Sequence, residues 1–471
     1  MKQQRMRFRF LTLLTILLLL LAAGYGVYSV SSYGSRWVSS ARNTRYRSSK
    51  SSVIPGDIYD RNGVKIASTD EEGNRTYQSD VWARSSLVHL IGDTDGNVAN
   101  GLDSFQANYL LGFETSLSER ISALLSGQTR KGDSLTVTVD SRLSTYIVEQ
   151  WLQNSKTRNK CGAVVVLNYK TGEVLSLVSL PVYDPSNITD EIRTSTTHPF
   201  WNRALQSTLP PGSTFKIITA ASALQNLSDA QTRVYTCTGA TQVDDHTITD
   251  YGMSQHGELN LQKAFRVSCN NVFAQTALLV GDQALRKTAE GFGFNDNFLF
   301  RDLVVENSAY PTKNRTYLEI AWSGDGQSQV VATPLHMCMV AAAIANDGVM
   351  MEPRLISRVE SPSGVVRLRY AQKAYRTACT PQIAATLDTY MKDVVKSGTG
   401  TRAAVEGLSI AGKTGSAEGN VNGRDVTHAW FTGYMDNDQA PYAVCVMVEE
   451  GGSGGTVAAP IAQKVFEYLA P

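Results

Sequence analysis

The chain has 471 residues, which is too long for one ordinary hydrophobic core and predicts two or three domains. Lysine and arginine total 44 against 43 aspartates and glutamates, so the net charge of +1 gives no basic surface that would indicate nucleic acid as a partner. The six cysteines form no C-x-x-C pair, which argues against a zinc cage and a small disulfide scaffold. We expect mostly buried thiols, with one disulfide left open.

The chain begins with a basic tail and a long apolar run. No charged residue occurs between Arg9 and Arg36, and residues 10–30 are long enough to cross a membrane as one helix. Because four basic residues precede this run, we expect a cytoplasmic tail at 1–9 and a single-pass protein of the cell membrane, with the bulk of the chain outside the cytoplasm. A signal peptide cut near Ala22 is the alternative, although the run exceeds the roughly 7–15 residues of a signal core.

Short strand patterns follow the apolar run. Residues 31–52 are rich in serine and arginine and have the composition of an exposed linker. Residues 56–68, GDIYDRNGVKIAS, predict a strand, an Asn-Gly turn and a second strand. With one amphipathic pattern at 116–127, we interpret 31–155 as a linker and a small α+β module, a pedestal or dimerisation unit.

The pattern of hydrophobic residues changes from Cys161 onward. Residues 161–180 contain two strong β runs around a turn and predict a hairpin. Helical patterns follow at 222–227, 260–280, 333–347 and 382–398. Two strands and a last helix are predicted at 428–435, 442–450 and 457–470. This order predicts an α+β domain over 156–471, an antiparallel sheet with helices packed on it.

Two motifs fit known sites by their letters alone. Gly407–Thr414 fits the phosphate-binding pattern G-x-x-x-x-G-K-[ST], but a turn-rich segment follows where a nucleotide site needs a helix. Gly451–Gly455 fits G-x-S-x-G, but no histidine follows it, so we interpret it as a flexible loop. The histidines have no partners placed by sequence for metal binding, and we expect neither a metal nor a cofactor.

The segment 209–225, LPPGSTFKIITAASALQ, predicts a turn and then a helix with Ser213 at the N-cap. Lys216 is three residues past this cap, where the helix dipole disfavours a cation. Ser213 and Lys216 share one helix face, so a buried, neutral Lys216 can take the serine's proton without any histidine. The spacing alone is weak evidence, because about two S-x-x-K matches are expected by chance in a chain of this length.

Two further motifs follow in the chain. The S-x-N at 268–270 places a hydroxyl and an amide close together, suited to relaying a proton and holding a substrate amide. Of three K-x-G matches, 170–172 is better explained by a hairpin turn and 396–398 by a helix end. The third, at 413–415, follows a strand that can pair with an extended peptide, bring a cation to its carboxylate and aim a backbone N–H at an oxyanion.

S-x-x-K, S-x-N and K-T-G in this order are the signature of penicillin-binding proteins and serine β-lactamases. The resemblance is narrowed to one class of these proteins by the surrounding segments, such as GDIYDRNGVKIA, NRALQSTLPPGSTFKIITA, GTGTRAA and AGKTGSAE. Over nearly its whole length the chain resembles a class B penicillin-binding protein of the compact PbpA-like branch. The resemblance implies a penicillin-binding transpeptidase fold and a peptidoglycan D,D-transpeptidase that acts through a serine acyl-enzyme, needs no cofactor and is inhibited by β-lactams.

The resemblance also implies roles for the first two motifs. Ser213 attacks the penultimate D-Ala carbonyl of a stem peptide that ends in D-Ala-D-Ala, and Lys216 is the general base. Ser268 passes the proton towards the leaving amine. Asn270 holds the amide of the acyl chain.

The third motif is implied to bind substrate. Lys413 and Thr414 bind the terminal carboxylate, and Gly415 lets the substrate approach closely. The backbone N–H groups of Ser213 and Ser416 form the oxyanion hole, and no metal takes part.

The 31–155 module is too short for the glycosyltransferase domain of class A. The resemblance therefore implies a monofunctional enzyme that works beside a polytopic glycosyltransferase of the SEDS family, the shape, elongation, division and sporulation proteins. A D,D-carboxypeptidase with water as acceptor would use the same residues. A β-lactamase would need a carboxylate for deacylation, which no loop supplies, and a β-lactam receptor would need more membrane segments. A non-catalytic cell-wall scaffold is the alternative from another class, and the complete motif set argues against it.

Overall fold

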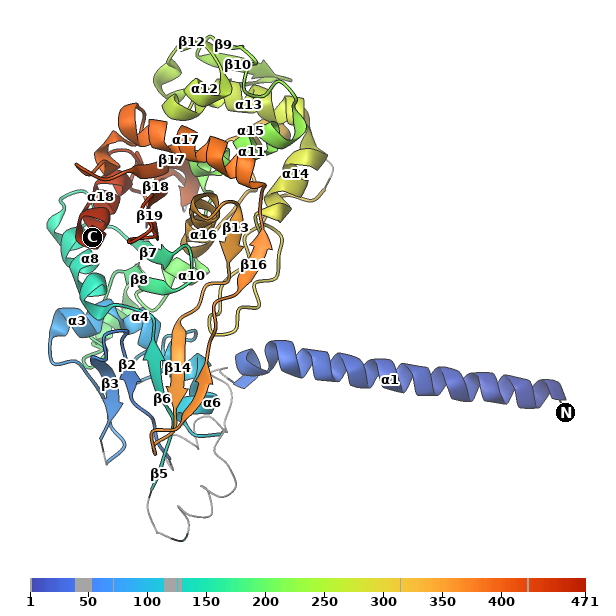
Figure 1. The fold of residues 1–471 in the computed structure, drawn as a ribbon, viewed down its shortest axis with the longest axis vertical. Coiled ribbons are helices and arrows are strands. Elements are labelled where there is room, and N and C mark those ends of the chain that lie inside the picture. Colours follow the sequence, from blue (N-terminus) through green and yellow to red (C-terminus); the bar gives the residue numbers. More distant parts are fainter. Residues whose placement is uncertain are drawn as a thin grey trace.

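The computed structural model describes residues 2–38, 53–70, 72–113, 125, 129–313, 315–421 and 423–471. Helix α1 (Lys2–Val38) extends away from the rest of the chain in Figure 1, and its section Met6–Val30 is a candidate membrane span. The linker expected after this helix lies outside the described residues. So does the amphipathic pattern at 116–127, apart from Leu125.

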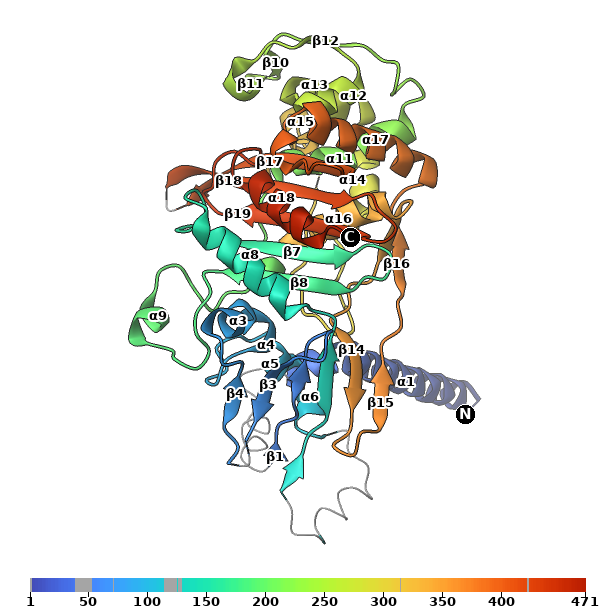
Figure 2. The same ribbon diagram turned by 60° about the vertical axis from the view of Figure 1, so that its left-hand side comes forward.

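A five-stranded antiparallel sheet lies at the centre of the larger part of the molecule (Figure 2). Its strands, in spatial order, are β17 (Ile410–Val421), β18 (Arg424–Met435), β19 (Tyr442–Val448), β7 (Gly162–Asn168) and β8 (Val174–Leu180). Alternate residues of β7 enter two separate cores, Val165 on one face and Val164 on the other. Its β-branched run is therefore buried on both faces. The hairpin predicted at 161–180 is confirmed as β7 and β8.

Helices cover both faces of this sheet. On one face lie α8 (Ser141–Gln153) and α18 (Ala458–Leu469), which pack Trp151 and Phe466 against it. On the other face lie α11 (Lys216–Asn226), α16 (Pro334–Ala345) and α17 (Pro381–Ser397). Helix α16 is apolar on all sides because it is enclosed between the sheet and other helices. The α+β class and the helices predicted at 333–347, 382–398 and 457–470 are confirmed.

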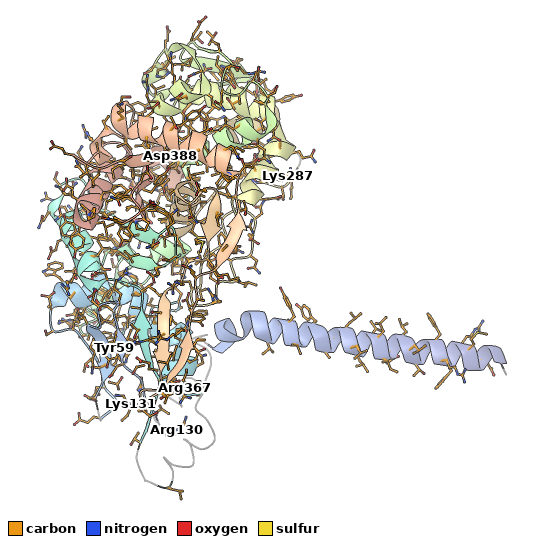
Figure 3. The ribbon with its side chains drawn as sticks, in the orientation of Figure 1. Tyr59, Arg130, Lys131, Lys287, Arg367 and Asp388 are labelled. Atoms are coloured by element: carbon orange, nitrogen blue, oxygen red, sulfur yellow. The ribbon has the colours of Figure 1, made fainter. Side chains whose placement is uncertain are left out.

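A second, six-stranded sheet lies below the first in Figure 1. Its strands, in spatial order, are β15 (Val366–Arg369), β14 (Ile356–Glu360), β6 (Ser134–Val137), β2 (Ile58–Tyr59), β3 (Lys65–Thr69) and β4 (Arg75–Tyr77). The strand–turn–strand predicted at 56–68 is confirmed as β2 and β3. In Figure 3 the labelled Lys131 and Arg367 lie in this part, far from α12 and α13 at the top of the same view.

The expected division at 155/156 follows neither sheet. Helix α8 precedes that position in the chain but packs on the central sheet. Strands β14 and β15 follow it but complete the N-terminal sheet, with Ile356 opposite Val137. The two parts are therefore interleaved along the chain.

A small lobe of residues 235–259 lies at the top of Figure 1. It consists of two antiparallel pairs, β9 (Tyr235–Cys237) with β12 (Gly257–Leu259), and β10 (Ala240–Val243) with β11 (His246–Thr249). Helices α12 (Leu261–Val267) and α13 (Asn270–Val280) follow it directly and contact it. The lobe is thus placed beside the S-x-N motif.

Candidate active site

The segment after Pro211 enters the site as a 3-10 turn. This turn, η1, spans Gly212–Phe215, and α11 begins only at Lys216, with Phe215 as an N-cap that makes no side-chain hydrogen bond. The prediction that Ser213 is the N-cap is therefore wrong. The physical reason lies in Gly212, which has a φ of +54°. A Cβ atom added to this glycine would lie only 3.0 Å from Ala417. The turn is pressed against β17 and tightened before the helix starts.

The expected residues meet at one cleft of about 510 Å³. Those that line it are Ser213, Ser268, Asn270, Thr414 and Ser416. Ser213 is partly exposed, whereas the side chains of Lys216 and Lys413 are 0% exposed. The cleft thus presents hydroxyl and amide groups while both lysines are enclosed by protein.

The S-x-N motif forms a break between two helices. Ser268 ends α12 with left-handed dihedral angles (φ 61°, ψ 38°), so the single helical pattern predicted at 260–280 is interrupted there. Lys216 Nζ donates to Ser268 O at 2.8 Å and to Asn270 Oδ1 at 2.7 Å. Ser268 Oγ lies 3.4 Å from Lys216 Nζ and 2.8 Å from Lys413 Nζ. One serine hydroxyl therefore bridges the two buried amino groups.

A buried carboxylate that the sequence analysis missed completes this cluster. Asp325 Oδ1 lies 3.1 Å from Lys216 Nζ. Burial raises the pKa of Asp325 to about 6, against the opposing attraction of Lys216. Burial, with the nearby positive charge of Lys216, holds the pKa of Lys413 well below its usual value. Asp325 lies in the turn after α15 (Tyr317–Gly324) and belongs to no recognisable motif. The neighbouring sequence therefore does not identify it as a site residue.

The K-T-G motif lies on β17, which among the described residues pairs only with β18. Thr414 Oγ1 is 2.6 Å from Oγ1 of Thr399, a cleft residue for which the sequence analysis gave no role. A Cβ on Gly415 would lie 2.8 Å from Pro211 O and 3.1 Å from Thr214 Cγ2. This glycine therefore lets β17 pack closely on the turn that carries the serine, and its role towards substrate stays a prediction.

Neither of the two misleading motifs forms its own site. Strand β17 continues through the phosphate-binding pattern, so no helix begins after it. The Gly451–Gly455 segment is a loop beside β17, in which Gly454 N donates to Ser416 Oγ at 3.2 Å and Ser453 lines the cleft.

All six cysteines are free thiols, so the disulfide that composition left open is not formed.

Comparisons with known proteins agree with this geometry. Residues 162–467 match the family model described as penicillin binding protein transpeptidase domain. The chain is 33% identical over 390 residues to peptidoglycan D,D-transpeptidase PbpA of Mycolicibacterium smegmatis, which covers 78% of each chain. It is 32% identical over 371 residues to the protein of the same name from Mycobacterium tuberculosis, which covers 74% of each.

A solved structure gives the same result. Penicillin-binding protein A from M. tuberculosis, as its ceftriaxone acyl-enzyme complex, superposes with a TM-score of 0.81 at 28% identity. The match covers 90% of this chain and 99% of that one. The ordered motifs, the shared fold and these matches together place the chain in the penicillin-binding protein transpeptidase family, as a class B member of the PbpA branch.

Proposed function

We propose that this protein is a peptidoglycan D,D-transpeptidase whose nucleophile is Ser213. The observation that supports this most is that Ser268, which contacts both buried lysines, lines the same cleft as the partly exposed Ser213. The hydroxyl of Ser268 lies between the amino groups of Lys216 and Lys413, at 3.4 and 2.8 Å. A serine at a cleft with a buried amine as its base is the arrangement that acyl transfer through a covalent intermediate requires.

In the first step, Lys216 passes its extra proton to Asp325, 3.1 Å away, and becomes a neutral amine. Ser213 Oγ then attacks the penultimate D-Ala carbonyl carbon, and its proton passes to Lys216. The intermediate then breaks its C–N bond to the terminal D-Ala, and the leaving amine takes that proton through Ser268. In the second step, the amine of another stem peptide attacks the acyl-enzyme. Its proton returns through the same groups to Ser213, which leaves as the cross-link forms.

Substrate is held along β17. Lys413 and Thr414 bind the terminal carboxylate, and the Thr399 hydroxyl orients that of Thr414 at 2.6 Å. The backbone N–H groups of Ser213 and Ser416 form the oxyanion hole, each contributing about 3–4 kcal/mol to the transition state. A β-lactam presents a strained amide in the same place and acylates the same serine.

Asn270 has two tasks. Its Oδ1 atom accepts from Lys216 Nζ at 2.7 Å, and its Nδ2 atom donates one N–H to Thr249 O at 3.0 Å. The second N–H of this amide remains for the acyl chain of the substrate. Asn270 therefore both orients the base and holds the peptide.

The location follows from the N-terminus. Helix α1 spans the membrane, its basic start remains in the cytoplasm, and the cleft lies outside. The part of the molecule that carries the six-stranded sheet is a docking pedestal for a polytopic SEDS glycosyltransferase, which supplies the glycan strands.

The test uses the full-length protein in detergent. Fluorescent penicillin should label the wild type covalently, and Ser213→Ala should abolish labelling. Ser453→Ala, which removes another cleft serine, is the matched control and should label normally. With a D-Ala-D-Ala substrate and an acceptor amine, mass spectrometry should detect cross-linked product. Hydrolysis alone would contradict the proposal and indicate a carboxypeptidase.

A further inference from the structure

Strand β17 continues along the cleft beyond the K-T-G motif, as the edge strand of the central sheet on the side of the small lobe (Figure 2). Successive side chains of a strand point to opposite faces, so Thr414, Ser416 and Glu418 lie on one face of β17. All three line the cleft. The row that begins at the proposed carboxylate site therefore ends in a glutamate.

The spacing along β17 relates Glu418 to the donor peptide. A strand rises about 3.3 Å per residue, so Glu418 is about 7 Å beyond Ser416 and about 13 Å beyond Thr414. A peptide paired with this edge has its terminal carboxylate at Thr414 and its penultimate carbonyl at Ser416. The residue that precedes D-Ala-D-Ala is then the next one along the strand, and a long side chain on it reaches Glu418.

The charges of the cleft favour a cation at this end. Its described lining residues include neither lysine nor arginine, and three of them are carboxylates: Asp250, Asp325 and Glu418. Asp325 pairs with Lys216 at 3.1 Å, and Asp250 accepts the first backbone N–H groups of α13. Glu418 has no ion-pair partner among the residues that the structure describes. It is therefore the carboxylate left to bind a charged group of the substrate.

The surroundings of Glu418 suit an ammonium group. Thr427 of β18 lies directly opposite Glu418 in the hairpin and also lines the cleft. Side chains in directly opposite positions are about 5 Å apart at Cβ, so a hydroxyl and a carboxylate face the same space. Arg424, at the start of β18, pairs with Glu450 at 3.6 Å. An ammonium has three N–H donors, and these two side chains supply acceptors for it.

We propose that Glu418 binds the side-chain ammonium of the residue that precedes D-Ala-D-Ala in the donor stem peptide. This inference rests on the proposed function, because cross-linking requires an amine on the stem peptide that acts as acceptor. Any stem peptide can serve as donor or as acceptor, so the donor carries the same amine, protonated and unreacted. Glu418 is thus a specificity-determining residue that selects cationic donors and takes no part in bond making.

The test uses full-length protein in detergent and three peptides that end in D-Ala-D-Ala. The preceding residue is lysine, Nε-acetyl-lysine or glutamate. Hydroxylamine, which is mostly uncharged at pH 7.5, is the acceptor, so that any effect of charge comes from the donor. The wild type should prefer the lysine peptide to the acetyl-lysine peptide about three- to tenfold in kcat/KM. The difference should lie mainly in KM, because a contact remote from the reacting bond is made equally in the ground and transition states.

Variants separate binding from a structural role. Glu418→Gln should remove the preference for lysine while turnover of the acetyl-lysine peptide and penicillin labelling stay unchanged. Glu418→Lys should prefer the glutamate peptide. Asp425→Asn is the matched control, because Asp425 is a carboxylate of the same hairpin that binds Asn420 Nδ2 at 3.0 Å, and this variant should keep the preference. The preference of the wild type should also weaken as salt rises.

Equal kcat/KM for the lysine and acetyl-lysine peptides would overturn the proposal, as would a preference that survives Glu418→Gln. A loss in Glu418→Gln that appears only when a cationic acceptor replaces hydroxylamine would also overturn it and assign Glu418 to the acceptor. These results are distinguishable from failure of the proposed function. Without a D,D-transpeptidase site no peptide is turned over at all, whereas failure of this inference leaves turnover intact and removes only the preference for charge.

Discussion

Replacing Asp325 with asparagine should make the protein more stable and its acylation slower. This carboxyl is buried 3.1 Å from Lys216 Nζ, and burial raises its pKa from 3.8 to about 6. A carboxyl with a higher pKa in the fold binds its proton more tightly there than in the unfolded chain. Its contribution to stability is therefore full below about pH 4 and is lost as the pH rises through about 6.

The size of the effect follows from the shift. Raising the pKa of Asp325 from 3.8 to about 6 corresponds to about 3 kcal/mol, because one pKa unit is worth about 1.36 kcal/mol. Removing one partner of a buried ion pair commonly costs about 3–5 kcal/mol because the other charge is left without a partner. Here Lys216 keeps Ser268 O and Asn270 Oδ1 as acceptors at 2.8 and 2.7 Å, so we expect relief of the buried negative charge to dominate. Asp325→Asn should gain up to about 3 kcal/mol at pH 7.5 and almost nothing at pH 4.

Thermal melts of the full-length wild type and Asp325→Asn, from pH 4 to 7.5, measure this directly. The two melting temperatures should separate by several degrees as the pH passes 6. Penicillin acylation at pH 7.5 should slow about tenfold or more, because the group that orients Lys216 has lost its charge. Asp229→Asn, which removes a surface carboxylate, should show no such pH dependence. A variant that melts at or below the wild type at pH 7.5, or gains equally at pH 4, would refute the reasoning.

Lys216→Met should block penicillin acylation and also lower the melting temperature, because it removes both the base and the partner of the buried Asp325 carboxylate; normal acylation by the folded variant would remove Lys216 as the base. Gly454→Ala should slow acylation and destabilise the protein by about 1–3 kcal/mol, since its Cβ would lie 2.2 Å from Trp430 O. Unchanged melting and labelling would contradict the close packing of this loop on β17. Thr399→Val should raise KM for a D-Ala-D-Ala substrate more than it lowers kcat, because Thr414 loses its 2.6 Å partner; steady-state kinetics would show the reverse if Thr399 acted in the chemical step.

Features set by neighbours in the chain could be predicted from the sequence. The β7–β8 hairpin and helix α17 follow from alternation and from helical periodicity. The three catalytic motifs were found because their residues are two or three apart, and the fold brings them to one cleft. The roles given to these residues stay predictions until the variants are measured.

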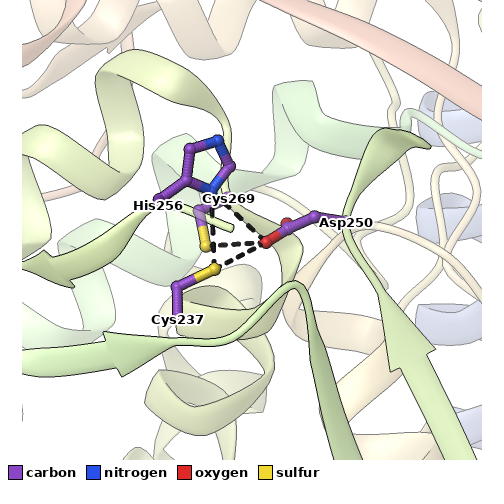
Figure 4. Close-up of side chains that lie close together, drawn as sticks. All are labelled: Cys237, Asp250, His256 and Cys269. Carbon is purple, nitrogen blue, oxygen red and sulfur yellow. Dashed lines mark hydrogen bonds and ion pairs between the residues drawn. The ribbon is translucent and has the colours of Figure 1, made fainter. Parts of the chain in front are cut away.

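Features that depend on distant contacts could not be predicted. The break at Ser268 is invisible to periodicity because Phe265 and Phe273, on either side of it, both face the core. Asp325 becomes significant only when its turn meets Lys216 across the site. Cys237, Asp250, His256 and Cys269 are spaced C-x12-D-x5-H-x12-C, which resembles no local motif, and only the hairpins of the lobe bring their side chains together (Figure 4).

The interleaving of the two sheets sets an order for folding. Strand β6 pairs with β14, so the edge of β6 at Val137 has no β14 partner until Ile356 has been synthesised. An uncovered strand edge is a template for pairing with other chains. During synthesis the nascent N-terminal part therefore needs protection from aggregation until most of the catalytic part has emerged. A fragment that stops before β14 should be insoluble for the same reason.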